Sequence, residues 1–395
     1  MKGSRKPEEI VLVTSGHLAM DHRIYDKEAV TLAEQYPHVR IVGTHAASEF
    51  QGKVWIHALR PCRSRLERFL LRPLHCFLAA CKPGSRRTLI LHDAELLFWA
   101  PLVKLLTGDT IIYDVHENFS QLLLRRAWIP PRLRASMSRV ISFVEKACAT
   151  SVDGVIGVTE TLAEHFAHRN RVAIYNLPSR EFILTAAERA RPLEERTYDL
   201  VHLGTLSEER LEFLCTVLDA FFSRRPAARA LVIGVRPDQQ QALSTRFPAQ
   251  RVSIIGKIPY GRVSEYLGTC RIGLDVHPVL YPHLRCAVPV KVFEYMAAGC
   301  NIVTSYLPEL HRLLGDDGAE HVVTMYTPDP GHFVEEICRL LDSPESLERH
   351  QTALMQLISR RLNWELEAQK LVTFIGTFTQ RKETVSGEQV LDHQC

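Results

Sequence analysis

A lysine and a glutamate lie one helical turn apart in the segment PVKVFEYMAAG, which runs from Pro289 to Gly299. Proline suits the first turn of a helix and glycine the position just past its end, so the segment predicts a helix over about residues 289–298. The unpaired N–H groups and the dipole at the start of a helix favour phosphate. Lys291 on the phosphates and Glu294, on the same face, on the ribose hydroxyls would match a nucleotide diphosphate. The alternative is an exposed ion pair on a surface helix, which is the more common meaning of an isolated K-x-x-E.

Segments of strand length and of helix length alternate along the chain. Apolar runs such as IVLVTSG and RTLILHD are followed by amphipathic stretches such as KEAVTLAEQ and ELLFWAPLVKLL. This alternation is typical of β-α units on a parallel sheet. The polar stretch LTAAERARPLEERTY interrupts it, and it restarts at DLVHLGT. We therefore predict an α/β protein with two doubly wound Rossmann-like domains at 1–183 and 198–360, a linker at 184–197, a C-terminal helix at 361–380 and a polar tail at 381–395.

The composition is that of a soluble globular protein, with 46% hydrophobic and 24% charged residues among 395. A formal net charge of +3 gives no argument for a nucleic-acid partner. The ten cysteines are scattered singly, and the N-terminus lacks the apolar stretch and cleavage site of a signal peptide. No window reaches the roughly 18 to 20 apolar residues that a membrane span needs. These features predict a cytoplasmic protein with reduced thiols.

Several segments together resemble family-4 glycosyltransferases, the retaining enzymes of GT-B fold. PVKVFEYMAAGCNIVTSYLPEL resembles their donor-site segment, and SGHLAMDHRIYDKEAVTLAEQ resembles their first loop and helix. YDVHENF and GVIGVTETLAEHF resemble later first-domain segments, and LVHLGTLSEERLEFL resembles the opening of the second domain. The matches follow the family's order through both domains. The resemblance implies a GT-B fold with two domains facing across a cleft, a C-terminal helix that crosses back to the first domain, and sugar transfer from a nucleotide-diphosphate sugar.

The resemblance also implies which residues bind the donor phosphates. Gly16, on the first loop, would bring its backbone close to them, where a side chain would intrude. Arg210 matches the basic residue that clamps the diphosphate. The lysine that usually follows it is absent, so either Lys291 or Lys257 is expected to supply the second positive charge.

Glu294 matches the second glutamate of the family's E-x7-E pattern, and the first would fall at Cys286. That first carboxylate ordinarily contacts the transferred sugar, so Cys286 is a departure from the pattern, although subfamilies with the P-x-K-x-x-E-Y form commonly lack the acid. In the segment HPVLYPHLRCAV, the side chains of His277, His283 or Arg285 are candidates to take over the sugar contacts. An ordinary loop role for each is the alternative.

His116 directly follows an apolar strand, beside Asp114 and Glu117. In an open parallel sheet this end of a strand points toward the ligand crevice, so we expect His116 to contact the donor sugar and to help position the acceptor. A structural histidine is the alternative. The remaining acceptor-side candidates are Asp21, Arg23, His92, Asp93 and Glu117.

We expect neither a metal nor another cofactor. No H-x-E-x-H motif and no Cys/His cluster with zinc spacing occurs in the sequence. A cationic clamp also makes a divalent ion unnecessary for stabilising the leaving diphosphate.

Retention by double displacement would need a carboxylate beneath the anomeric carbon. The second domain has no acid that the sequence obviously places there. The resemblance implies instead a same-face substitution, in which the departing phosphate oxygen accepts the proton of the acceptor hydroxyl. We therefore expect His116, Arg210 and Lys291 to be catalytic.

Two stretches of the first domain are strongly basic. Residues 54–87 contain eight Lys or Arg and one acid, Glu67, and residues 125–139 contain five Arg and no acid. Such stretches can lie on anionic lipid, so we expect a glycan or lipid-linked acceptor and peripheral attachment to the inner face of a membrane. The alternative is helices that pack on their own domain, with solvated arginines.

Two other functions remain open. A nucleotide-sugar epimerase can share this architecture, and Cys286 keeps open a non-catalytic partner in a polysaccharide assembly complex. A dinucleotide-binding dehydrogenase is disfavoured because neither VTSGHLAMDH nor VIGVRPD completes G-x-G-x-x-G.

Overall fold

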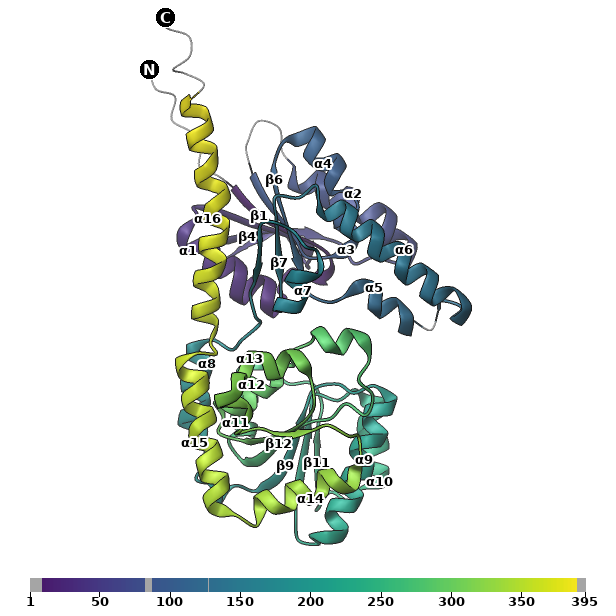
Figure 1. Ribbon diagram of the computed structural model, residues 1–395, viewed down its shortest axis with the longest axis vertical. Helices are drawn as coiled ribbons and strands as arrows, with labels where there is room; N and C mark the ends of the chain where they lie inside the picture. The colour runs from purple at the N-terminus through teal and green to yellow at the C-terminus, as the bar shows by residue number, and fades with distance from the viewer. Residues whose placement is uncertain (1–8, 82–86, 127, 389–395) are drawn as a thin grey trace, which may run out of the picture. The chain divides into compact units, whose positions relative to one another are not determined.

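The computed structural model describes residues 9–81, 87–126 and 128–388. The chain forms two compact units: unit 1 comprises Met1–Asn176 and Glu367–Cys395, and unit 2 comprises Leu177–Leu366. Each unit contains one largely parallel sheet with helices, so the predicted α/β class with two Rossmann-like domains is confirmed (Figure 1).

The sheet of unit 1 has eight strands in the order β3-β4-β2-β1-β5-β6-β7-β8. All neighbours are parallel except β3 and β4. The middle of each central strand is apolar because helices cover both faces of the sheet, and every residue of β5 and β6 is buried. The strands are β1 (Glu9–Leu18), β2 (His38–Thr44), β3 (Glu49–Gln51), β4 (Val54–Leu59), β5 (Arg87–Leu91), β6 (Thr110–Val115), β7 (Gly154–Gly157) and β8 (Arg171–Ala173).

The helices of unit 1 form two layers. The chain passes from β1 to β2 in one direction across the sheet, and from β4 through β8 in the other. Because parallel crossovers are right-handed, α2, α4 and α6 lie on the face opposite α1, as Figure 1 shows. The elements are η1 (His22–Ala29), α1 (Val30–Gln35), η2 (Glu67–Leu71), α2 (Arg72–Ala80), α3 (Ala94–Leu97), α4 (Ala100–Thr107), α5 (Phe119–Leu122), η3 (Leu123–Arg125), α6 (Pro131–Ala149) and α7 (Glu160–His165).

The C-terminal helix α16 (Trp364–Glu388) returns to unit 1. Its Glu367 carboxylate accepts the N–H of Tyr175 at 2.9 Å. The rings of Phe374 and Phe378 fill the space beside Gly154, where a Cβ would come within 2.8 Å of them. The predicted crossing back of this helix is confirmed, and the helix continues through residues 381–388, which we expected to belong to the polar tail.

Unit 2 has a six-stranded parallel sheet in the order β11-β10-β9-β12-β13-β14. Its strands are β9 (Tyr198–Leu203), β10 (Ala230–Ile233), β11 (Val252–Ile255), β12 (Cys270–Asp275), β13 (Asn301–Ser305) and β14 (Val323–Met325). Its helical elements are α8 (Arg180–Arg189), η4 (Leu193–Glu195), α9 (Glu208–Arg224), α10 (Pro237–Arg246), η5 (Tyr260–Arg262), α11 (Val263–Leu267), η6 (Pro282–Cys286), α12 (Val290–Ala297), α13 (Pro308–Ala319), α14 (Pro330–Leu341) and α15 (Pro344–Arg360). Within the described ranges, no helix combines the length and the apolar character that crossing a membrane requires.

The expected linker at 184–197 is partly helical. Helix α8 begins after Ser179, whose hydroxyl accepts the N–H of Phe182, and it runs to Arg189. Phe182, Ile183 and Ala186 are buried, while the charged side chains lie on the remaining faces. The charge-rich composition therefore belongs to an amphipathic helix of unit 2, and the two units divide at residue 176 rather than 183.

In both sheets the strand order reverses at one point, which is β1/β5 in unit 1 and β9/β12 in unit 2. The carboxyl ends of the strands at such a reversal leave a crevice in which ligands bind. The two candidate sites of this protein lie at these points.

Candidate functional site

Two cations of unit 2 meet at one buried carboxylate. Asp275 ends β12 and is fully buried. Its Oδ1 lies 2.8 Å from Lys291 Nζ and 3.2 Å from Nη2 of Arg210. Arg210 also donates from Nε to the carbonyl of Val276 at 2.7 Å. The structure thus brings together two of the predicted catalytic residues, through an acid that the sequence analysis missed.

The electrostatics of this cluster favour an anionic ligand. Burial opposes ionisation of Asp275, but the charges of Lys291, His277 and Arg210 hold the pKa of its carboxyl well below the usual range. Burial lowers the pKa of Lys291, and Asp275 opposes that shift. Burial, with the charges of Lys291 and Arg210, holds the pKa of His202 well below its usual value, so this imidazole is neutral. Two cations therefore share one carboxylate where the helix dipole is also positive.

Helix α12 presents Lys291 in its first turn. The helix spans Val290–Ala297, close to the predicted 289–298, and Gly299 follows with a φ of 63°. Tyr295 fixes the helix to the sheet because its hydroxyl accepts the N–H of Leu203 at 2.8 Å and donates to the carbonyl of Leu274 at 3.2 Å. The contacts of Tyr295 with β9 and β12 hold α12 at the point where the strand order reverses.

Two glycines open the backbone beside this cluster. Gly204 follows β9 with a φ of 98°. Apart from its two chain neighbours, no described residue has an atom within 4 Å of the place where its Cβ would be. A Cβ on Gly234, which follows β10, would come within 3.2 Å of the Gly204 backbone. The strand ends therefore approach each other closely and leave room for a ligand.

The other predicted donor residues differ in burial and in their position relative to this cluster. Lys257 is exposed after β11, the edge strand, with β10 between it and β9. Of the two candidates for the second positive charge, the structure therefore places Lys291 beside Arg210. Glu294 and Cys286 are both buried, and their expected contacts with ribose and sugar stay predictions. His277, one of the three loop candidates, lies 3.1 Å from Asp275 through Nε2.

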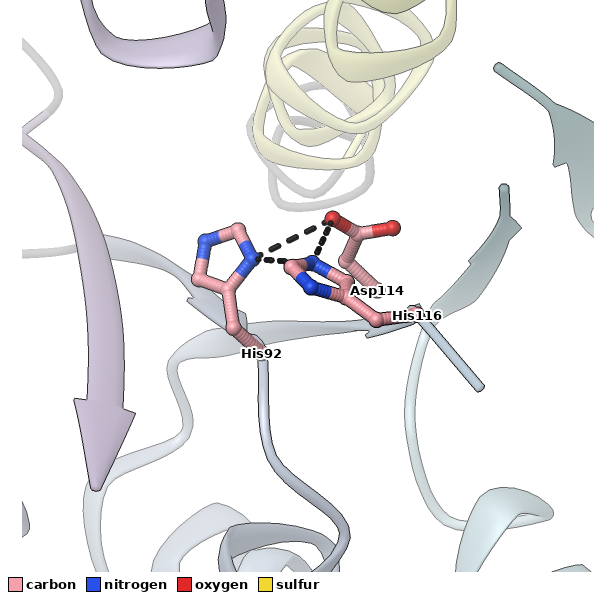
Figure 2. Close-up of side chains that lie close together, drawn as sticks. All are labelled: His92, Asp114 and His116. Atoms are coloured by element: carbon pink, nitrogen blue, oxygen red, sulfur yellow. Dashed lines mark hydrogen bonds and ion pairs between the residues drawn. The ribbon is translucent and has the colours of Figure 1, made fainter. Parts of the chain in front are cut away.

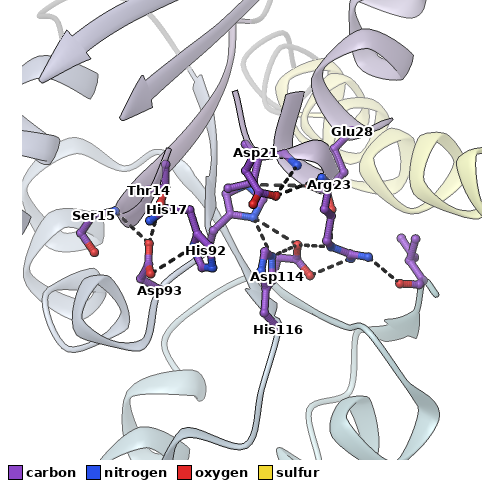
Figure 3. A network of polar contacts seen from close by, with 12 residues as sticks. Thr14, Ser15, His17, Asp21, Arg23, Glu28, His92, Asp93, Asp114 and His116 are labelled. Atoms are coloured by element: carbon purple, nitrogen blue, oxygen red, sulfur yellow. Dashed lines mark hydrogen bonds and ion pairs between the residues drawn. The ribbon is translucent and has the colours of Figure 1, made fainter. Parts of the chain in front are cut away.

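A cavity of about 230 Å³ lies within unit 1, at the carboxyl ends of β1, β5 and β6. Five of the predicted residues line this cavity. The sequence analysis missed the other polar lining residues, among them His17, Arg68 and Tyr113. Figure 3 shows part of this polar network. The predicted residues in its wall are Gly16, His92, Asp93, His116 and Glu117.

Asp93 organises the loop after β1. Its Oδ2 accepts hydrogen bonds from the Thr14 hydroxyl at 2.7 Å and from the N–H groups of Ser15 at 2.8 Å and Gly16 at 3.1 Å. His17 Nδ1 lies 3.2 Å from its Oδ1, and this hydrogen bond raises the pKa of His17. Burial opposes ionisation of Asp93, but the hydrogen bond and charge of His17 lower the pKa of its carboxyl. A side chain at Gly16 would come within 2.6 Å of Asp93, so the glycine is required here whether or not phosphate approaches it.

Asp114 joins the two histidines of the cavity, as Figure 2 shows. Its Oδ2 lies 3.1 Å from His92 Nδ1 and 2.9 Å from His116 Nε2, and the two nitrogens are 3.2 Å apart. Two imidazoles and a carboxylate at this spacing form a set that a transition metal could use. The guanidinium of Arg23, however, donates to both oxygens of Asp114, at 3.2 and 3.1 Å. We interpret the cluster as a hydrogen-bonded network around one paired carboxylate.

Arg23 does not take the exposed acceptor-side position that we expected, and the acceptor-side role of Asp21 stays a prediction. Asp21 caps η1 by accepting the N–H groups of Arg23 and Ile24. Arg23 is 3% exposed, and besides Asp114 it contacts Glu28 at 2.8 Å and the carbonyl of Ile174 at 3.0 Å. Arg23 therefore has a structural role in the interior of unit 1. Sequence reasoning placed it outside because an unpaired arginine is almost never buried.

A buried acid behind the cavity wall predicts a pH dependence of stability. Burial raises the pKa of Glu145 to about 7, and the hydroxyl of Tyr113 donates to it at 3.1 Å. As pH rises from the ordinary value of 4.5 through about 7, the unfolded carboxyl ionises first. The unfolding free energy therefore falls by up to roughly 3 kcal/mol over this window. Urea unfolding should find Glu145→Gln more stable than the wild type at pH 8 and nearly equal at pH 4.5. A difference that does not change with pH would contradict this.

Comparisons with known proteins agree with this architecture. Residues 197–343, within unit 2, match the family described as glycosyl transferases group 1. No curated protein matches the chain.

Sucrose-phosphate synthase from Thermosynechococcus elongatus has a similar structure, with a TM-score of 0.73 and 16% identity over 95% of this chain and 100% of that chain. For α,α-trehalose 6-phosphate synthase from Burkholderia multivorans the TM-score is 0.67, with 13% identity over 95% of this chain and 100% of that chain. HepE from Anabaena, in complex with UDP-glucose, has a TM-score of 0.67 and 11% identity over 93% of this chain and 99% of that chain. The chain therefore has the GT-B fold of these proteins, and its residues 197–343 are similar to the glycosyl transferases group 1.

Proposed function

We propose that this protein is a retaining glycosyltransferase of family 4. It moves a hexosyl group from a nucleotide-diphosphate sugar to a hydroxyl of a glycan or lipid-linked acceptor, in the assembly of a cell-surface polysaccharide. The observation that carries the proposal is the meeting of Arg210 and Lys291 at Asp275, beside the start of α12. The P-x-K-x-x-E-Y form of the segment at Pro289 is the reason for choosing family 4 within the glycosyl transferases group 1.

The diphosphate binds at the amino end of α12. The N–H groups of Val290 and Lys291, at the start of the helix, donate to its oxygens. Lys291 and Arg210 exchange part of their contact with Asp275 for contact with phosphate. Glu294, one turn further along the helix, accepts the ribose hydroxyls. Support comes from HepE, a protein of similar fold whose structure holds UDP-glucose.

Asp275 bears on the choice of mechanism. A double displacement needs a carboxylate that is free to attack the anomeric carbon. Asp275 is fully buried and is held by Lys291 and Arg210, which makes it a poor nucleophile. We therefore favour the same-face substitution, in which the leaving diphosphate takes the acceptor proton while the two cations absorb its developing charge.

In unit 1, His116 contacts the sugar and helps position the acceptor. Its Nε2 is held by Asp114, which leaves Nδ1 for a substrate hydroxyl. His116 and His92 both line the cavity, but His116 is partly exposed whereas His92 is buried, and the buried Asp114 is not part of the lining. Asp114 thus acts through His116 as a positioning residue.

The direct test is product analysis with purified protein and a panel of nucleotide-sugars. Release of the nucleoside diphosphate, with a glycosylated product whose anomeric configuration matches the donor by NMR, would support the proposal. An altered sugar still attached to its nucleotide would show an epimerase. Binding of a nucleotide-sugar without any turnover, even slow hydrolysis, would show a non-catalytic partner.

Activity should not depend on a divalent cation. The carboxylate of the His92, Asp114 and His116 cluster already has a buried guanidinium as its counter-charge, and Lys291 and Arg210 serve the phosphates. Excess EDTA should leave the initial rate unchanged. A rate that EDTA abolishes and that one metal ion restores would contradict this prediction.

A further inference from the structure

Unit 1 exposes an unusual number of large apolar side chains. Leu78 is 68% exposed, Leu105 82%, Leu106 74% and Phe143 74%. Single exposed leucines are ordinary, but a gathering of them marks an interaction surface. Unit 2 shows only Leu184, Val279, Leu280 and Tyr326 among its described residues. The twelve between residues 66 and 143 are Leu66, Leu70, Leu71, Leu74, Leu78, Leu102, Leu105, Leu106, Trp128, Leu133, Val140 and Phe143.

These side chains come from one layer of unit 1. Helices α2, α4 and α6 connect successive strands in the same direction and therefore cover the same face of the sheet. The guanidinium of Arg65, at the start of the η2 region, lies 5.4 Å from the ring centroid of Trp128, just before α6. The exposed residues of this layer, from Leu66 to Phe143, are here called the outer face.

Cations accompany the apolar residues on α6. Arg132, Arg139 and Lys146 are exposed, and none of them forms an ion pair with the part of the chain that the structure describes. They recur along the helix together with Leu133, Val140 and Phe143. The only acid of α6, Glu145, is buried. This side of α6 is therefore both apolar and positive.

The basic stretch at 54–87 contributes less to a charged surface than its composition indicates. Arg72 and Arg87 are buried, and Arg87 pairs with Asp109. Arg68 pairs with Glu95 at 2.7 Å and Arg60 with Glu67 at 2.5 Å. Lys82 and Arg86 lie outside the described residues. Arg63 and Arg65 remain exposed.

We propose that the outer face docks on an anionic lipid bilayer. Its leucines and Phe143 enter the boundary between headgroups and acyl chains, while Arg132, Arg139 and Lys146 meet lipid phosphates. The unbalanced positive charge among apolar side chains is what selects an anionic lipid surface as the occupant. This docking needs no donor chemistry, and it goes beyond the proposed function by naming the surface that brings the protein to a lipid-linked acceptor.

Vesicle flotation tests the docking. The full chain should float with vesicles of phosphatidylcholine and phosphatidylglycerol, release with added salt, and stay behind with phosphatidylcholine alone. Arg132→Gln with Arg139→Gln should weaken binding roughly fivefold for each cation removed. Val140→Glu with Phe143→Glu should abolish flotation. The matched control is Leu184→Glu, on unit 2, where the leucine is 64% exposed and where binding should not change.

Three results would overturn the proposal. They are a wild-type protein that does not float, equal binding to neutral vesicles, or equal losses in the control and the outer-face variants. Light scattering that shows a dimer broken by Val140→Glu with Phe143→Glu would assign the face to a second copy instead. Each variant must melt at the wild-type temperature, since these side chains are on the surface. Vesicle binding without turnover of any nucleotide-sugar would contradict the proposed function but would still support the docking.

Discussion

A Lys291→Met variant is expected to have a kcat about 10²- to 10³-fold below that of the wild type. Methionine keeps most of the length of the side chain and removes its charge. Lys291 is the cation of the first turn of α12, 2.8 Å from the buried Asp275, and its side chain is only 13% exposed. A positive charge held in such a place stabilises the leaving diphosphate more than an exposed one would, because little water screens it. Initial rates over a range of donor concentrations separate kcat from KM.

The matched control for this variant is Lys257→Met, which makes the same chemical change at an exposed lysine after the edge strand β11. It should keep kcat within about threefold of the wild type, on the scale of a surface charge. Equal losses in the two variants, or a change only in KM for Lys291→Met, would contradict the role of Lys291 in the transition state.

Arg23→Met is expected to lower the free energy of unfolding by about 3 to 5 kcal/mol, the cost of removing one partner of a buried ion pair. Arg23 lies between two fully buried acids, 2.8 Å from Glu28 and 3.1 Å from Asp114. Without the guanidinium, both carboxyls would be buried together without this counter-charge. Urea unfolding followed by circular dichroism measures the loss.

The loss in Arg23→Met should shrink at acid pH, since the two acids can then be buried in the neutral form. Arg339→Met, which removes an exposed arginine paired with Glu336, is the control and should cost less than about 1 kcal/mol. A comparable, small loss in both variants, with a raised KM for the acceptor in Arg23→Met alone, would return Arg23 to the acceptor-side role that the sequence indicated.

The fold followed from the sequence because its signals are local. Apolar runs of strand length gave the buried parallel strands, and Pro289 and Gly299 placed α12 to within about a residue at each end. The expected linker at 184–197 was misplaced because charged residues on the outside of α8 have the composition of a linker. Only the spacing of Phe182, Ile183 and Ala186 reveals the helix.

The candidate site was harder to predict because its contacts depend on strand order. Asp275 contacts Arg210 and Lys291 only because β12 pairs with β9. This pairing cannot be predicted from the local sequence. A signal for Asp275 was nevertheless present. It ends an apolar strand in RIGLD, as Asp93 follows one in RTLILHD. If every acid at the end of an apolar strand had been taken as a candidate site residue, Asp275 would have been predicted.

The proposed function requires that the cationic cluster of unit 2 binds a nucleotide diphosphate, and isothermal titration measures this binding most directly. UDP, GDP and ADP are each titrated into the wild type, Lys291→Met and Lys257→Met. At least one of them should bind the wild type and Lys257→Met alike, and should bind Lys291→Met at least about tenfold more weakly, the loss of one charge-assisted hydrogen bond. If none binds the wild type, or if all three proteins bind with the same affinity, the cluster at Asp275 is not the donor site.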